Sequence, residues 1–289
     1  MNVAAAQFNP VLGDLQANLR RHLEWAEEAA GRGADLLLFP ELSLTGYALR
    51  DLAAQLALPA GDPFFQPLLE ASRRLAICAG FVEGTAEGLV HNAQAFFAEG
   101  RLLHVHRKVF LPTYGLFEEG RFFARGRHFR AFDSPLGRLG LMICNDWWHA
   151  AGPLLLVQDG AGLLLAPAAS PLRGLTPRPA SAPGWMESPG GENGRVWYTL
   201  LSAHAKMQAT PILFCNRVGF DDGMGFWGGS SLWGADGLRQ AGLDHADEAL
   251  LVAEWSEAAT IRQRNYSPLL RDEDLPLWQA ELDSLLRRR

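Results

Sequence analysis

The chain has 289 residues, of which 48% are hydrophobic and 20% charged, a balance that excludes a disordered protein. The 26 Lys and Arg residues against 32 Asp and Glu give a formal charge of −6, which argues against a general nucleic-acid surface. No apolar run reaches the roughly 18–20 residues that a membrane span needs. The N-terminus lacks a basic segment before its apolar run, and three scattered cysteines cannot form a disulfide framework. We therefore expect a cytoplasmic protein with free thiols.

Short apolar segments alternate with longer helical patterns, which predicts an α/β protein. In the first half of the chain we expect a strand at 2–8, a helix at 15–30, a strand at 35–39, a helix at 64–75, a strand at 76–82 and a hairpin at 92–98 and 102–107. In the second half we expect a strand at 139–144, a helix at 147–159, a strand at 163–166, a helix at 195–208, a strand at 211–215 and hairpin strands at 229–233 and 250–255.

The segment at 167–194 is rich in Pro, Gly and Ser, and loops of this length tend to be functional or disordered. No sharp change in composition divides the chain, so we expect one domain over residues 1–270. The tail at 271–289 is amphipathic and either packs on a partner subunit or remains a solvated end.

Three polar residues lie at the ends of predicted strands, where α/β folds place their sites. Glu41 comes directly after the strand at 35–39 and Pro40, a position that suits a general base, although a carboxylate capping a helix would look the same. Lys108 ends a strand, where its ammonium could stabilise an oxyanion or simply be solvated. Cys144 ends a strand before a helix, which favours a thiolate, although most strand cysteines are inert core residues.

Lysine is rare in this chain, because only Lys108 and Lys206 occur among 26 basic residues. An ammonium is a compact charge with a tunable pKa, whereas the arginine fork is wide and always charged. Each lysine therefore marks a position that a guanidinium would not serve, or it is a chance surface residue.

Other combinations of residues carry weaker signals. His104 and His106 alternate along one strand, a spacing seen in metal sites, but no third ligand is evident and we expect no metal. His149 could pair with Cys144, although the helix turn between them makes that geometry unfavourable. The sequence contains neither a Gly-Lys phosphate loop nor a G-x-S-x-G elbow.

Taken together, these segments resemble the carbon–nitrogen hydrolases of the nitrilase superfamily, whose members use Glu, Lys and Cys in this chain order. The matching motifs are PELSLTGY around Glu41, HRKVFLPTYGLFEE around Lys108, ICNDWW around Cys144, and CNRVG with FWGGSSLWGADG further along. The Lys108 segment is especially similar to the glutaminase domain of glutamine-dependent NAD synthetases. The resemblance covers residues 2–256.

This resemblance implies a four-layer α-β-β-α sandwich, commonly paired into dimers, and a thioester mechanism that needs no cofactor. In that mechanism Glu41 would deprotonate Cys144, protonate the departing ammonia and later activate water. Lys108 and the backbone N–H of Asn145 would hold the oxyanion. The family's second carboxylate maps onto Glu119, with Glu118 as the alternative. Candidate substrate contacts are Tyr47, Tyr114 and Trp147, which lie in the motifs, and Trp185, which lies in the long segment at 167–194.

The chain departs from NAD synthetases because we expect no ATP-using synthetase domain within residues 1–289, so such a role would require a separate partner. The leading hypothesis is a cytoplasmic amidase that cleaves a small carboxamide or carbamoyl compound and releases ammonia. The alternatives are a glutaminase subunit that supplies a separate synthetase, and a catalytically silent interaction module. We expect a homodimer or larger homo-oligomer that binds neither nucleic acid nor membrane.

Overall fold

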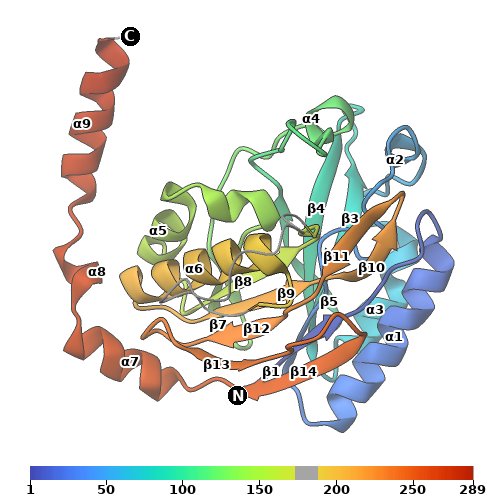
Figure 1. Cartoon of the computed structure of the whole chain (residues 1–289), viewed down its shortest axis with the longest axis horizontal. Helices are drawn as coiled ribbons and strands as arrows, with labels where there is room; N and C mark the ends of the chain where they lie inside the picture. The colour runs from blue at the N-terminus through green and yellow to red at the C-terminus, as the bar shows by residue number, and fades with distance from the viewer. Residues whose placement is uncertain (173–187, 289) are drawn as a thin grey trace.

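Two six-stranded sheets form the centre of the protein and lie face to face (Figure 1). The computed structural model describes residues 1–172 and 188–288. The first sheet has the order β14 (Ala249–Glu254), β1 (Asn2–Gln7), β2 (Leu36–Leu38), β3 (Ala76–Gly84), β4 (Val90–Ala98) and β5 (Arg101–Arg107). The second sheet has the order β13 (Arg239–Gly242), β12 (Ser231–Trp233), β9 (Ile212–Asn216), β8 (Leu163–Ala168), β7 (Gly137–Leu141) and β6 (Phe132–Ser134).

Helices cover the outer face of each sheet and complete four layers (Figure 1). Helices α1 (Leu15–Gly31) and α3 (Gln66–Ala71) pack on the first sheet, and α5 (Ala151–Gln158) and α6 (Gly191–Met207) pack on the second. A third apolar cluster fills the space between the sheets. Because both faces of the central strands are buried, these strands read as continuous apolar runs in the sequence. The structure therefore confirms the predicted α-β-β-α sandwich.

Two predicted features of the second half differ from the structure. The strands expected as a hairpin at 229–233 and 250–255 both exist, but β12 pairs with β9 and β13, whereas β14 pairs with β1 in the other sheet. The helix expected from residue 147 begins at Ala151, and a 3₁₀ turn, η2 (Cys144–Trp148), comes before it. The predicted hairpin was therefore wrong, and the residues after β7 follow a tighter turn than an α-helix.

The first and last strands of the sandwich lie side by side. Strand β1 pairs with β14 in antiparallel register, with Asn2 opposite Glu254, and its other edge pairs in parallel with β2. The N-terminal strand is therefore an interior strand of its sheet, and the C-terminal strand forms the edge.

The remaining helices and strands are short, or lie outside the sandwich. They are α2 (Leu52–Gln55), η1 (Pro63–Phe65), α4 (Glu119–Phe122), the hairpin of β10 (Val218–Asp221) and β11 (Met224–Trp227), α7 (Glu257–Tyr266), α8 (Leu269–Asp272) and α9 (Leu275–Arg287). Helix α9 projects away from the body, and none of its residues is buried (Figure 1). Within residues 1–172 and 188–288, no helix is long and apolar enough to cross a membrane.

Candidate active site

A buried lysine joins two carboxylates where strands of the first sheet end. Lys108 follows β5 and is fully buried. Its Nζ donates to Oε1 of Glu41, which follows β2, and to Oε1 of Glu119 in α4, both at 2.6 Å. Three ionisable groups therefore share one hydrogen-bonded cluster, and Glu119 rather than Glu118 supplies its other carboxylate. Glu118 instead forms an ion pair with Arg121 at the surface.

Glu41 is held from both sheets. Its Oε1 also accepts a hydrogen bond from Asn92 Nδ2 on β4 at 2.7 Å. Its Oε2 accepts from the backbone N–H of Ala169, directly after β8, at 2.8 Å. With three donors on two oxygens and no exposed surface, this carboxylate has one fixed orientation.

Cys144 stands on a sharp bend between β7 and the 3₁₀ turn η2. Its φ of +45° lies in the left-handed region, which costs a non-glycine residue on the order of 1–3 kcal/mol and is concentrated at functional sites. Burial, and then the negative charge of Glu41, raise the pKa of the Cys144 thiol well above its ordinary value, while the positive charge of Lys108 opposes them. A hydrogen bond with Glu41 acts in the same direction as burial. The resting residue is therefore a thiol, and the Glu41 carboxylate lies near enough for its charge to act on that thiol.

The charges of the cluster shift the pKa values of its other members. Although burial alone lowers it, the negative charges of Glu119 and Glu41 raise the pKa of Lys108 above its ordinary value, so the ammonium form persists. Burial raises the pKa of Glu119 to about 7 against the opposing charge of Lys108. Tyr47, whose hydroxyl donates to Glu119 Oε1 at 2.6 Å, has a pKa raised well above its ordinary range by burial and by both carboxylates.

Cys144 opens into a pocket of about 160 Å³. Its lining consists of Pro112, Tyr114, Phe117, Cys144, Asn145, Trp148, Ser170, Pro171, Asn193 and Trp197. An apolar cavity of ~150 Å³ holds one benzene molecule, so this pocket suits a small substrate. Among the described lining residues there is no carboxylate, ammonium, imidazole or guanidinium.

The predicted substrate contacts lie in different places. Tyr114 lines the Cys144 pocket, and its hydroxyl donates to Asn145 Oδ1 at 3.4 Å. Trp147 is fully buried in the core, where its Nε1 donates to the Met142 carbonyl at 3.0 Å, and the neighbouring Trp148 lines the pocket instead. Trp185 lies outside the described residues.

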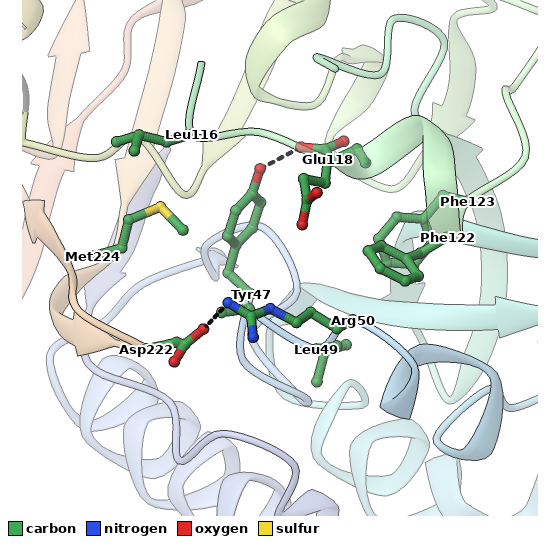
Figure 2. Close-up of a pocket in the computed structure, with 11 residues that line it drawn as sticks. Tyr47, Leu49, Arg50, Leu116, Glu118, Phe122, Phe123, Asp222 and Met224 are labelled. Carbon is green, nitrogen blue, oxygen red and sulfur yellow. Dashed lines mark hydrogen bonds and ion pairs between the residues drawn. The ribbon is translucent and has the colours of Figure 1, made fainter. Parts of the chain in front are cut away.

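Tyr47 lines a second pocket (Figure 2), and Cys144 is not among the residues that line it. Glu118, Glu119 and Met224 also line it, and an ion pair joins Arg50 to Asp222 in its wall. The hydroxyl of Tyr47 thus bonds to the cluster while its ring faces a different cavity.

The histidines that the sequence singles out take structural positions. His104 stacks on Phe132, and His149 stacks on Phe110 with ring centroids 3.5 Å apart. His106 contacts Asp146 at 3.0 Å. Within the described part of the chain, no group of three His, Cys, Asp or Glu residues could hold a metal.

Sequence reasoning missed the groups that orient the cluster. Asn92 carried a faint signal, since it is a polar residue that opens a predicted apolar strand. The backbone N–H of Ala169 carried none, because its role depends only on where β8 ends. Asp146 stands in the ICNDWW motif, but three of its four partners lie more than thirty residues away in sequence.

Fold and site together define a class of protein: a four-layer α/β sandwich whose buried thiol, carboxylate and ammonium suit nucleophilic catalysis at a carbonyl. The model of the carbon-nitrogen hydrolase family matches residues 2–265, and the chain belongs to this family.

Its relatives include both long and short proteins. It is 35% identical to a glutamine-dependent NAD(+) synthetase of Thermotoga maritima over 57% of this chain and 29% of that one. It is 28% identical to a probable nitrilase of Schizosaccharomyces pombe over 92% of this chain and 93% of the relative. The chain spans half or less of the length of the NAD synthetases that it matches.

The similar solved structures also include proteins of about this length and longer ones. An amidase of Nesterenkonia sp. AN1 superposes with a TM-score of 0.78 at 25% identity, covering 97% of this chain and 99% of that one. A glutamine-dependent NAD+ synthetase of Acinetobacter baumannii superposes with a TM-score of 0.75 at 28% identity, covering 90% of this chain and 46% of that one.

Proposed function

We propose that the protein is an amidase that cleaves a small carboxamide or carbamoyl compound through a cysteine thioester and releases ammonia. The observation that carries this proposal is the Lys108 ammonium, 2.6 Å from both Glu41 and Glu119, in a cluster whose charges act on the Cys144 thiol. The cluster combines a nucleophile, a base and a cation, the three groups that acyl transfer requires.

In the proposed reaction, Glu41 takes the thiol proton and Cys144 Sγ bonds to the amide carbonyl carbon. Lys108 and the backbone N–H of Asn145 stabilise the oxyanion of the tetrahedral intermediate. The C–N bond breaks as Glu41 returns the proton to nitrogen, and ammonia leaves. Glu41 then takes a proton from water, whose oxygen attacks the thioester, and the thiol is regenerated as the acid departs. No cofactor enters these steps.

The neutral lining of the Cys144 pocket favours an uncharged substrate. Aromatic rings and amide side chains pack well against a small amide, whereas a charged group would lose its water without gaining a counter-ion from the described lining. A double mutant of the Nesterenkonia amidase has been solved in complex with acrylamide, a small neutral amide, at a TM-score of 0.78 and 25% identity.

A glutaminase subunit that passes ammonia to a separate synthetase is the second candidate. The observation that favours it is the 35% identity to an NAD(+) synthetase. This function predicts turnover of L-glutamine that increases when a synthetase and ATP are added, whereas a free-standing amidase needs neither.

The deciding experiment measures ammonia release from L-glutamine, short aliphatic and aromatic amides and N-carbamoyl compounds, with Cys144→Ala as the control. We expect turnover of neutral amides, and less than ~1% of it in the variant, because loss of a nucleophile removes nearly all catalysis. Turnover that survives in the variant would rule out the covalent mechanism. Absence of turnover together with an unreactive thiol would favour a silent interaction module.

We also propose that the protein works in the cytoplasm. Its three cysteines, Cys78, Cys144 and Cys215, are free thiols. Free thiols, one of them a nucleophile, suit a reducing compartment.

A further inference from the structure

Asp146 lies between the two segments that carry Lys108 and Cys144. Its side chain is fully buried, two residues after the nucleophile in η2. Oδ1 accepts hydrogen bonds from the backbone N–H groups of Val109 at 3.0 Å and Phe110 at 2.8 Å. These are the two residues that follow Lys108, so one oxygen of Asp146 holds the lysine segment.

The other oxygen of Asp146 holds the nucleophile segment. Oδ2 accepts from the backbone N–H of Ile143, directly before Cys144, at 3.1 Å. It also lies 3.0 Å from Nε2 of His106, a buried residue two positions before Lys108. A single carboxylate thus fixes the chain on both sides of the lysine and immediately before the thiol.

The backbone around Lys108 needs such an anchor. Strand β5 ends at Arg107, so the N–H groups of Val109 and Phe110 have no strand partner. An unpaired buried donor costs ~1–3 kcal/mol, and the Asp146 carboxylate removes two such costs at once. The ammonium position also matters for rate, since a misplacement of about 1 Å can cost ~10²-fold in catalysis.

We propose that Asp146, supported by His106, is a positioning residue that sets the distance between the Lys108 ammonium and the Cys144 thiol. This inference rests on the proposed function, because it assigns Asp146 a part in the same reaction. Asp146 acts through the backbone and does not itself contact the reacting atoms.

Asp146→Asn tests the proposal with little change in shape. The amide oxygen can still accept from Val109 and Phe110, but the NH₂ group now faces the Ile143 N–H and leaves it unpaired. We expect kcat to fall at least tenfold while KM changes less than threefold. We also expect a similar fall in the rate at which iodoacetamide alkylates Cys144, measured well below the Tm with Cys144→Ala as the blank.

Glu83→Gln is the matched control. Glu83 is a buried carboxylate that accepts two hydrogen bonds from the Arg107 guanidinium, at 2.6 Å and 2.8 Å, one residue before Lys108. Both substitutions replace a buried carboxylate that bonds near the end of β5 with an amide. The bonds of Glu83 run to a side chain, whereas those of Asp146 run to the backbone next to Lys108 and Cys144. We expect this variant to lower the Tm and to leave kcat and alkylation within twofold of wild type.

Wild-type kcat and alkylation in Asp146→Asn would overturn the proposal, as would an equal loss in Glu83→Gln or a change in KM alone. If Asp146→Asn does not fold, His106→Leu decides, since it removes one donor and keeps three. Slower alkylation in His106→Leu supports the proposal, and an unchanged rate overturns it. Alkylation needs no substrate. A wild-type protein that is alkylated at Cys144 but turns over no amide would therefore count against the proposed function alone.

Discussion

Lys108 shows how strongly the site depends on the shape of one side chain. Its compact ammonium fits between two carboxylate oxygens, each 2.6 Å away, in a space with no access to solvent. The chain otherwise uses arginine for nearly every positive charge, and Lys206, its other lysine, is exposed. The structure therefore gives a physical reason for a lysine at position 108 and none for the lysine at position 206.

Lys108→Arg should lower kcat by ~10²-fold or more, the usual cost of removing an oxyanion donor, although the charge is kept. The planar guanidinium is too wide for the buried space and would displace Glu41 or Glu119. Ammonia release from the best amide substrate measures the effect, and Lys206→Arg is the control. Normal rates in Lys108→Arg would show that charge alone suffices.

Glu119 gives the site a pH dependence that stability measurements can detect. Its pKa in the folded protein is raised to about 7 from an ordinary value of 4.5, chiefly by burial. Between these values the native protein keeps a proton that the unfolded chain has released, so this group lowers stability as pH rises.

Glu119→Gln removes that titration and keeps an oxygen that can accept from Lys108 and Tyr47. The Tm of the variant minus that of wild type should therefore rise from pH 5 to pH 8. We expect a rise of at least about 2 °C, the shift that ~1 kcal/mol produces in domains of roughly 150–250 residues. Thermal unfolding monitored by fluorescence measures it, and a constant difference would contradict the raised pKa.

Among the elements, β3 supports the turn that carries Glu41. The carbonyl of Gly80 accepts from the Leu44 N–H at 2.9 Å, and the N–H of Gly80 donates to Ser43 Oγ at 2.9 Å. A Cβ on Gly80 would lie 2.4 Å from the Leu42 nitrogen and 2.7 Å from the Pro40 carbonyl oxygen. The turn can lie this close to the strand only because position 80 has no side chain.

Gly80→Ala should therefore destabilise the protein by about 1–3 kcal/mol, the range for overpacked sites, and should also lower activity by displacing Glu41. Gly31→Ala is the control, because a Cβ there meets no atom within 4 Å. Urea unfolding and ammonia release measure both effects. Equal stability of the two variants would show that the turn moves aside at no cost.

The elements also show what a sequence can and cannot predict. Glu41, Lys108 and Cys144 could be chosen as candidates because each lies at the end of a predicted strand and within a motif that resembles the family. The pairing of β14 with β1 could not, because both candidate partners of that strand are apolar and nothing local selects between sheets. Trp148 rather than the predicted Trp147 lines the pocket, and both lie in a 3₁₀ turn where the sequence predicts the start of an α-helix.

At the scale of the whole molecule, helix α9 leaves a strongly apolar surface in solvent. Its exposed large residues are Leu275, Leu277, Trp278, Leu282, Leu285 and Leu286. A helix of this kind is stable mainly when a partner covers its apolar side. We expect a second copy of the chain to do so, in a homodimer or larger assembly.

Light scattering after gel filtration tests this expectation. Leu282→Asp combined with Leu285→Asp should convert the assembly to smaller species, because two charges then lie on the apolar side of α9. Ala280→Glu adds a charge on the opposite side of the helix and should leave the mass unchanged. A monomeric wild-type protein at micromolar concentration would contradict the expectation.

The pairing of β1 with β14 has a consequence for synthesis on the ribosome. Strand β1 is made first, yet one of its edges stays open until Glu254 has emerged and β14 can pair with it. Such long-range pairing slows folding, and an unpaired apolar strand is an aggregation hazard while it waits. Because Glu41 follows the neighbouring strand β2, the sheet that carries it is complete only when β14 has been translated. The strand that begins the sheet thus stays exposed until the strand that ends it has been made.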